Sequence, residues 1–186
     1  LFKKWFSKAE KSEINDPNAV AVATSNKDNQ PNVRMVLLKG LNNKGFVFYT
    51  NFNSKKGNEL KENQKASMCF HWKSLRRQVR AIGKVEEVSS KEADDYFNSR
   101  PYKNRIGAWA SSQSKILDKR ESFLKNIEEY EKKYPDPGKV PRPPHWSGWR
   151  LLPEEIEFWL DGDGRIHERL NYRKRNGKWF KELLYP

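Results

Sequence analysis

The sequence predicts a mainly β protein, in which an antiparallel barrel carries added helices. Short runs rich in Val, Ile, Phe, Tyr and Trp follow one another, mostly in hairpin order. Helical patterns stand between some of them, and this arrangement favours an antiparallel barrel with helical additions. The 186 residues fit a single domain, 1–186.

The first half of the chain is expected to place two helices among five strands. Leu1–Ile14 repeats its apolar residues with a helical period and ends before Asp16-Pro17. Ser54 is the expected N-cap of a helix that continues to about Asn63. The strands are Ala19–Thr24, Asn32–Lys39, Gly45–Thr50, Ala66–Trp72 and Gln78–Val88.

The stretch Arg34–Thr50 is expected to form a β-hairpin, because two apolar runs flank a Gly/Asn turn. Arg34 and Lys39 lie at the two ends of its first strand, on opposite faces and roughly 16 Å apart. One strand could then present cations to two separate anions. The alternative is a pair of solvated charges at the strand ends.

The second half is expected to contain two helices and then the remaining strands. Ser89 or Ser90 caps a helix that Pro101 ends, and Ser114–Tyr134 is the longest helical pattern, with Ser114 as its N-cap. Pro135–Pro144 reads as an extended connector. The last strands are Trp146–Leu152, Ile156–Leu160, Arg165–Arg173 and Lys178–Leu184, with Asn176-Gly177 as a hairpin turn.

The composition points to an anionic ligand. Lys and Arg number 37 against 24 acidic residues, a net charge of +13, which attracts polyanions or phosphorylated small molecules. A basic nucleic-acid-binding module is therefore one alternative. The basic residues are, however, mixed with acidic ones, and neither a zinc-finger spacing nor an RNP-like motif is present. We expect no nucleic-acid partner.

The remaining composition restricts the compartment and the kind of site. Cys69 is the single cysteine, so no intrachain disulfide can form and a reducing, cytoplasmic location is expected. No apolar run is long enough to span a membrane, so no membrane partner is expected. His71, His145 and His167 are scattered without metal-ligand spacing, and no metal site is expected.

Three groups of residues could bind anions. Strand periodicity places Arg165, His167 and Arg169 on one face, where three cations repel one another unless an anion lies between them; a solvated basic edge strand is the alternative. Lys55 and Lys56 follow Ser54 at a helix N-terminus, which favours an anion, although exposed lysines there are common. The third group is Tyr96 and Arg100, which share a helix face and could clamp a phosphate with Lys39.

Nine motifs occur in order along nearly the whole chain: RMVLLKG, FYTN, SKK, RRQVR, YFNSRP, IGAWAS, QS, EFW and RIHER. This set resembles the FMN-dependent pyridoxamine 5'-phosphate oxidases. The resemblance implies an FMN-binding split antiparallel β-barrel that forms homodimers with FMN sites at the subunit interface. It also implies oxidation of pyridoxamine 5'-phosphate and pyridoxine 5'-phosphate to pyridoxal 5'-phosphate, with dioxygen as acceptor and hydrogen peroxide as by-product.

The resemblance further implies a role for each matched residue. Arg165 and His167 would be catalytic and contact the substrate ring, and Lys39, Tyr96, Arg100 and Asn104 would bind the substrate phosphate. The implied FMN ligands are Arg34, Met35, Val36, Leu37, Leu38, Lys39, Tyr49, Thr50, Lys55, Lys56, Gln78, Gln113, Ser114, Trp159 and Arg169.

The chain departs from the family pattern in several places. Lys55 stands where many relatives have Arg, Asn104 where Ser is frequent, Leu160 where Gln is common, and Leu183 where many carry Arg. The chain starts at Leu1 without Met, and an upstream segment is expected to be missing. These departures leave open a flavin or tetrapyrrole binder without oxidase activity.

Overall fold

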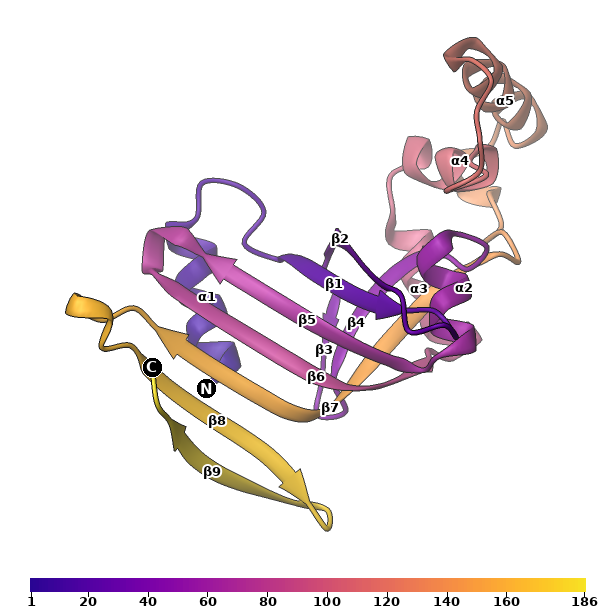
Figure 1. Ribbon diagram of the computed structural model, residues 1–186. Coiled ribbons are helices and arrows are strands. Elements are labelled where there is room, and N and C mark those ends of the chain that lie inside the picture. The colour runs from indigo at the N-terminus through magenta and orange to yellow at the C-terminus, as the bar shows by residue number, and fades with distance from the viewer.

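The computed structural model describes residues 1–186, which form one curled antiparallel sheet and five α-helices (Figure 1). The mainly β class and the split-barrel form are confirmed. The helices are α1 Phe2–Ser12, α2 Lys55–Glu62, α3 Ser90–Ser99, α4 Tyr102–Ala110 and α5 Arg120–Lys133. The strands are β1 Ala19–Ser25, β2 Pro31–Leu37, β3 Gly40–Leu41, β4 Phe46–Asn51, β5 Lys65–Trp72, β6 Arg77–Glu87, β7 Trp146–Leu160, β8 Glu168–Arg175 and β9 Lys178–Leu184.

The sheet curls because its two ends are joined in sequence. The strand order is β2-β1-β5-β6-β7-β4-β3, so that β2 and β3 lie at opposite ends of the order although they are consecutive in the chain. Alternate residues of β1, β5 and β6 are buried in the resulting core. Phe2 of α1 packs edge-on against Phe46 and Phe70, which fixes α1 on this core.

Strand β7 is a single strand of 15 residues where two separate strands were expected. Its first part pairs with β4 and its last part pairs with β8, both on the side opposite β6. A shift in the β6–β7 register at Ile82/Gly83 accommodates Pro153, which cannot donate a ladder hydrogen bond. A side chain at Gly83 would lie 2.0 Å from the Leu152 carbonyl oxygen, so glycine is required at this bulge. The sheet therefore branches at β7, which is followed by β4 along its first part and by β8 along its last part.

The expected pairing of 32–39 with 45–50 was wrong. β2 pairs along its whole length with β1, and only β3 pairs with β4 across the Gly/Asn turn. β1 offers seven paired positions to β2, whereas Leu38 turns into the core and its N–H donates to the Asn18 carbonyl oxygen. The longer ladder with β1 and the burial of Leu38 together explain why β2 pairs with β1 and not with β4.

The helical prediction for 114–134 was correct only for its second part. α5 begins at Arg120, its N-cap is Lys119, and Ser114 lies in a preceding turn with φ +71°. α4 was not foreseen, because Tyr102–Ala110 carries only a weak amphipathic pattern between Pro101 and the serine-rich turn. α4 and α5 stand away from the sheet in Figure 1. None of the helices combines the length and the apolar character needed to cross a membrane.

Candidate active site

A cavity of about 900 Å³ opens between β2, β4 and helices α2, α3 and α4. Six of its lining residues are Lys or Arg, and none is Asp or Glu. Such a cavity attracts anions. It brings together fourteen of the site residues expected from the sequence: Arg34, Met35, Val36, Leu37, Lys39, Tyr49, Thr50, Lys55, Lys56, Tyr96, Arg100, Asn104, Gln113 and Ser114.

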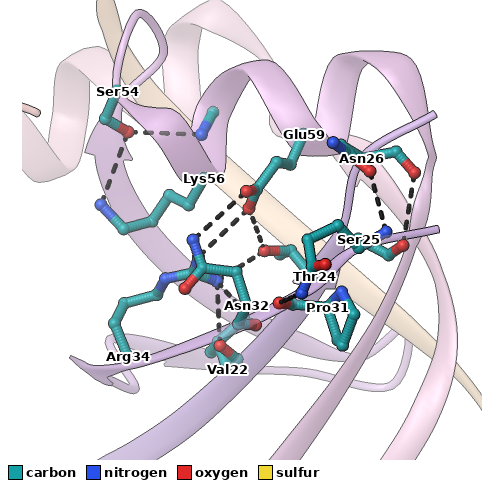
Figure 2. A network of polar contacts seen from close by, with 12 residues as sticks. Val22, Thr24, Ser25, Asn26, Pro31, Asn32, Arg34, Ser54, Lys56 and Glu59 are labelled. Atoms are coloured by element: carbon teal, nitrogen blue, oxygen red, sulfur yellow. Dashed lines mark hydrogen bonds and ion pairs between the residues drawn. The ribbon is translucent and has the colours of Figure 1, made fainter. Parts of the chain in front are cut away.

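Arg34 is held at the cavity wall by a buried carboxylate from α2. Figure 2 shows Glu59 reaching Arg34, whose Nη2 lies 3.1 Å from Glu59 Oε2. The other terminal nitrogen of Arg34 donates to Thr24 Oγ1 at 2.6 Å and to the Val22 carbonyl oxygen at 3.0 Å. Burial by itself would raise the pKa of Glu59, but hydrogen bonds from Thr24, Asn32 and Arg34 lower it below its ordinary value. Glu59 therefore stays ionised and fixes the guanidinium.

Lys56 is a buried cation in the first turn of α2. Its Nζ donates to Gln113 Oε1 at 2.9 Å and to Thr50 Oγ1 at 3.1 Å. Burial, with a smaller contribution from the nearby Arg34, lowers the pKa of Lys56 to about 8. Ser54 caps α2 by accepting a hydrogen bond from the Gly57 N–H, as expected. A bound anion would relieve the crowding of positive charge at this helix terminus.

Stacked aromatic rings form another wall of the cavity. The Tyr49 ring lies 4.0 Å from that of Tyr96 and 5.3 Å from that of Trp146, nearly parallel to both. Arg100 lies over Trp146, and one terminal guanidinium nitrogen is buried without a hydrogen-bond partner. Burial raises the pKa of Tyr49 to about 12 and lowers the pKa of Arg100. Tyr49 and Tyr96 are therefore neutral donors at physiological pH, beside an arginine that lacks an acceptor.

The strand periodicity predicted that Arg34 and Lys39 lie on opposite faces of one strand, and this prediction was wrong. β2 ends at Leu37, and the turn through Leu38 returns Lys39 to the same cavity as Arg34. Leu38 itself is buried in the core and does not line the cavity. The turn therefore converts two separated cations into a pair that faces one space.

The remaining expected site residues form a second group at the far end of β7. Gln78 of β6, Trp159 of β7 and Arg169 of β8 are cross-strand neighbours. His167 packs against Trp159 with ring centroids 4.6 Å apart. The expected strand face of Arg165, His167 and Arg169 was wrong, because β8 begins only at Glu168 and Arg165 lies in a 3-10 turn with φ +66°. Arg165 is exposed instead.

None of the second group lines the cavity, and β7 shows why. Trp146 at the start of the strand lines the cavity, whereas Trp159 lies near the strand's end. Trp159 comes thirteen positions after Trp146, which corresponds to roughly 40 Å of strand at about 3.3 Å per residue. Within one chain, Trp159 therefore lies far along β7 from the end of the strand that lines the cavity.

Sequence reasoning missed three residues that organise these groups. Glu59 and Trp146 are described above, and Glu157 is a buried carboxylate that pairs with Arg80 and with Arg169, the latter at 2.9 Å. Glu59 sits among lysines on a helix and looks like part of a solvated face. Only the alternation along 156–160 gave a signal for Glu157, since it falls on the same face as Trp159.

Comparison with known proteins identifies the family. Residues 6–134 match the family model described as pyridoxamine 5'-phosphate oxidase, which is more than half of the chain. The chain belongs to the pyridoxamine 5'-phosphate oxidase family. Residues 146–186 match the C-terminal dimerisation region of pyridoxine 5'-phosphate oxidase, which indicates that this member of the family forms a homodimer.

Relatives of this family member match along its full length. The pyridoxine/pyridoxamine 5'-phosphate oxidase of Pelagibacter ubique is 62% identical, with all of this chain and 90% of the relative covered. The enzyme of the same name from Agrobacterium fabrum is 55% identical and 91% covered. A crystal structure of PhzG from Burkholderia lata, in complex with tetrahydrophenazine-1-carboxylic acid, has a TM-score of 0.93 at 30% identity, covering 100% of this chain and 90% of that one. Because its full-length relatives are named as oxidases, this member of the family is an oxidoreductase.

Proposed function

We propose that the protein is an FMN-dependent oxidase that converts pyridoxamine 5'-phosphate and pyridoxine 5'-phosphate to pyridoxal 5'-phosphate. Dioxygen is the electron acceptor and hydrogen peroxide the by-product, and the enzyme works in the cytoplasm. Full-length relatives at 55–62% identity that carry this activity in their names support the substrate class. FMN is the cofactor of the family to which the chain belongs.

The single observation that carries the proposal is the unbalanced positive charge of the cavity. It has six cationic side chains, no acidic one, and a buried Arg100 nitrogen that lacks an acceptor. Both FMN and the substrate carry a phosphate, and two phosphates supply the charge and the acceptors that these groups lack. The residues present therefore fit the cofactor.

The cations divide naturally between two phosphates. Arg34, Lys55 and Lys56 converge from β2 and the α2 N-terminus, and they would hold the FMN phosphate. Tyr96 and Arg100 belong to the aromatic wall, and Lys39 lines the same cavity; these three would bind the substrate phosphate, with Asn104 as a further donor. The chemistry that bound FMN supplies is acceptance of a hydride from the substrate carbon bearing the amine or alcohol.

The second group of residues completes the site from the other subunit of a homodimer. In one chain, roughly 40 Å of β7 separates Trp159 from the cavity. The C-terminal dimerisation region contains Trp159, Arg165, His167 and Arg169, so these side chains belong to the part of the chain that meets a partner. Arg165 and His167 would orient the substrate ring, and Gln78, Trp159 and Arg169 would contact the flavin.

The test is an anaerobic reduction. The purified protein is loaded with FMN, pyridoxamine 5'-phosphate is added without oxygen, and the visible absorbance of oxidised flavin is followed. Bleaching that reverses when air is admitted, with one hydrogen peroxide formed per pyridoxal 5'-phosphate, is the expected result. A yellow protein that never bleaches would reduce the function to flavin binding, and a protein that holds no flavin would refute the proposal.

A further inference from the structure

A buried ion pair outside the cavity joins helix α3 to the sheet. Arg150 of β7 has only 7% of its side chain exposed, and its Nη2 lies 2.7 Å from Glu92 Oε1 and 2.6 Å from Glu92 Oε2. Its Nη1 donates to Glu86 Oε1 at 3.1 Å. Arg150 does not line the cavity, and the scheme above gives it no role. The helix that it holds, however, carries two of the proposed ligands of the substrate phosphate.

The sheet offers the first half of α3 few other anchors. Ala93 is the buried residue of this half, and it packs against Val47 and Val88. A side chain as small as alanine buries little apolar area, so this packing by itself fixes the helix weakly. The contact of Arg150 with Glu92 is the one ion pair between α3 and a strand. The N-terminal half of α3 therefore depends on Arg150 for its position.

Glu92 makes this contact although a local partner is within its reach. Ser89 is the N-cap of α3, and its hydroxyl accepts a hydrogen bond from the Glu92 N–H at 3.2 Å. The spacing Ser-x-x-Glu is that of a capping box, in which the glutamate side chain returns to the backbone N–H of the serine. Both carboxylate oxygens of Glu92 lie against Arg150 instead. The carboxylate thus serves the tie to the sheet and not the cap.

The position of the phosphate ligands follows from this end of the helix. Tyr96 lies one turn after Glu92 on the same helix face, and its ring is part of the stacked aromatic wall. Arg100 is the C-cap of α3 and lies 4.8 Å over the Trp146 ring. Backbone hydrogen bonds link successive turns, so a displacement of Glu92 is carried to Tyr96. Arg150 therefore controls how far α3 reaches into the cavity.

We propose that Arg150 is a positioning residue: through Glu92 it holds α3 at the depth at which the helix can bind the substrate phosphate. The identity of the substrate rests on the proposed function. Because α3 supplies the phosphate ligands and not the ligands of the substrate ring, the expected consequence is one of selectivity. Loss of the tie should weaken the binding of a phosphorylated B6 compound and leave the binding of its unphosphorylated form unchanged.

The test measures this selectivity by binding, without turnover. The ligands are 4-deoxypyridoxine 5'-phosphate and 4-deoxypyridoxine, which carry a methyl group at the carbon that would be oxidised and no aldehyde that reacts with lysine. Isothermal titration calorimetry with saturating FMN gives the Kd of each ligand. The ratio of the two Kd values measures what the phosphate contributes, and the wild type should bind the phosphorylated ligand more tightly.

Two variants break the tie from its two sides. Arg150→Met keeps an unbranched side chain of similar length, and Glu92→Gln keeps the shape of the side chain and the Ser89 cap. The carboxylates left behind in Arg150→Met are 43% and 35% exposed, so water can solvate them and the protein should fold. We expect Arg150→Met to lower the Kd ratio about tenfold, the equivalent of one weakened charge-assisted hydrogen bond. Glu92→Gln should change the ratio in the same direction.

The exposed ion pair of the same helix is the matched control. Lys91 Nζ lies 2.6 Å from Asp95 Oδ2, and the two side chains are 83% and 65% exposed. Lys91→Met and Asp95→Asn remove the same kinds of group from α3 without touching the sheet, so they should leave both Kd values unchanged. A Kd ratio that stays at the wild-type value in Arg150→Met and Glu92→Gln, or that falls equally in the controls, would overturn the proposal. Circular dichroism shows that all variants are folded.

The double variant Arg150→Met/Glu92→Gln tests the route. Since both residues act through one contact, the double variant should lose no more selectivity than Arg150→Met alone. Additive losses would contradict the route through Glu92. A wild type without phosphate preference would overturn the proposal together with the phosphate ligands. Flavin that never bleaches with pyridoxamine 5'-phosphate, beside a ratio that falls in both variants, would instead refute the oxidase function and support the positioning role of Arg150.

Discussion

The two groups of candidate site residues differ in how far a single chain holds them in place. The cavity group is complete in itself: a buried carboxylate holds Arg34, and Thr50 and Gln113 hold Lys56. The second group lies on the outer end of the sheet, where Arg165 is exposed with an unfavourable positive φ. The first group resembles a finished binding site, and the second resembles one half of an interface.

This difference shows which part of the site can act before the partner arrives. The cavity holds Arg34 and Lys56 in place and has a guanidinium nitrogen without an acceptor, so under our proposal phosphate binding is prepared within one subunit. Under our proposal, Arg165 and His167 contact the substrate ring, and they come from the dimerisation region of the other subunit. We expect cofactor retention to depend on the first group and turnover to depend on both.

The strongest test of this division is complementation between subunits. One chain carries Lys56→Ala and Arg34→Ala, and the other carries Arg165→Ala and His167→Ala. If the two groups combine across the interface, a heterodimer has one wild-type site and one site with both defects. The mixture should then recover turnover, up to half the wild-type rate per heterodimer, although each homodimer is inactive.

The measurement is the rate of pyridoxal 5'-phosphate formation after the two chains are co-expressed and the heterodimer is purified with two different tags. Two copies of the same double variant, tagged in the same way, are the control. A heterodimer as inactive as its parents would show that both groups act within one chain, contrary to the separation along β7.

The next largest effect is expected for the single variant Arg34→Ala, in its affinity for FMN and in its stability. Loss of charge-assisted hydrogen bonds worth about 3 kcal/mol should raise the Kd for FMN about 100-fold, measured by quenching of flavin fluorescence. The variant also leaves Glu59 buried without its cation, which should lower the free energy of unfolding in urea by about 1–3 kcal/mol.

The double variant Arg34→Ala/Glu59→Gln separates these two causes. It should regain much of the stability but not the FMN affinity, because the carboxylate is gone and the phosphate ligand is still missing. Arg120→Ala, at an exposed arginine without an ion pair, should change neither quantity. Full recovery of FMN binding in the double variant would rule out Arg34 as a phosphate ligand.

The smallest effect is a pH dependence from Lys56. Its pKa of about 8 means that the free protein loses this charge as the pH rises through 8, whereas a bound phosphate keeps the lysine protonated. FMN affinity should therefore fall above pH 8, by at most about tenfold per pH unit. Lys56→Met should bind FMN more weakly at pH 7 and lose this component of the pH dependence, and an identical pH profile in both proteins would contradict the assignment.

The same lowered pKa affects stability with a definite sign. The unfolded chain keeps this lysine protonated up to a pH of about 10.4, while the folded chain releases the proton near 8. The folded state without ligand is therefore penalised below pH 8, and this penalty is relieved progressively between the two values. Removing the charge in Lys56→Met should thus stabilise the ligand-free protein at pH 7.

Local sequence patterns were sufficient for several of the elements and for many of the residues that line the cavity. The Ser54 cap predicted α2, Ser89 predicted the start of α3, and Asn176-Gly177 predicted the β8–β9 turn through two left-handed residues. These features depend on interactions within a few residues, so the sequence alone determines them. The ordered motifs predicted the family and its fold for the same reason, since each motif is a short run of residues.

The arrangement of the site depended on contacts that no local pattern encodes. β2 pairs with β1 because of a longer ladder and a buried Leu38, and this choice returns Lys39 to the side of Arg34. Glu59 meets Arg34 from 25 positions away, and Trp146 closes the aromatic wall from a distant strand. Such pairs form only when the sheet curls, so tertiary structure decided which charges face one another and which group is left for a second subunit.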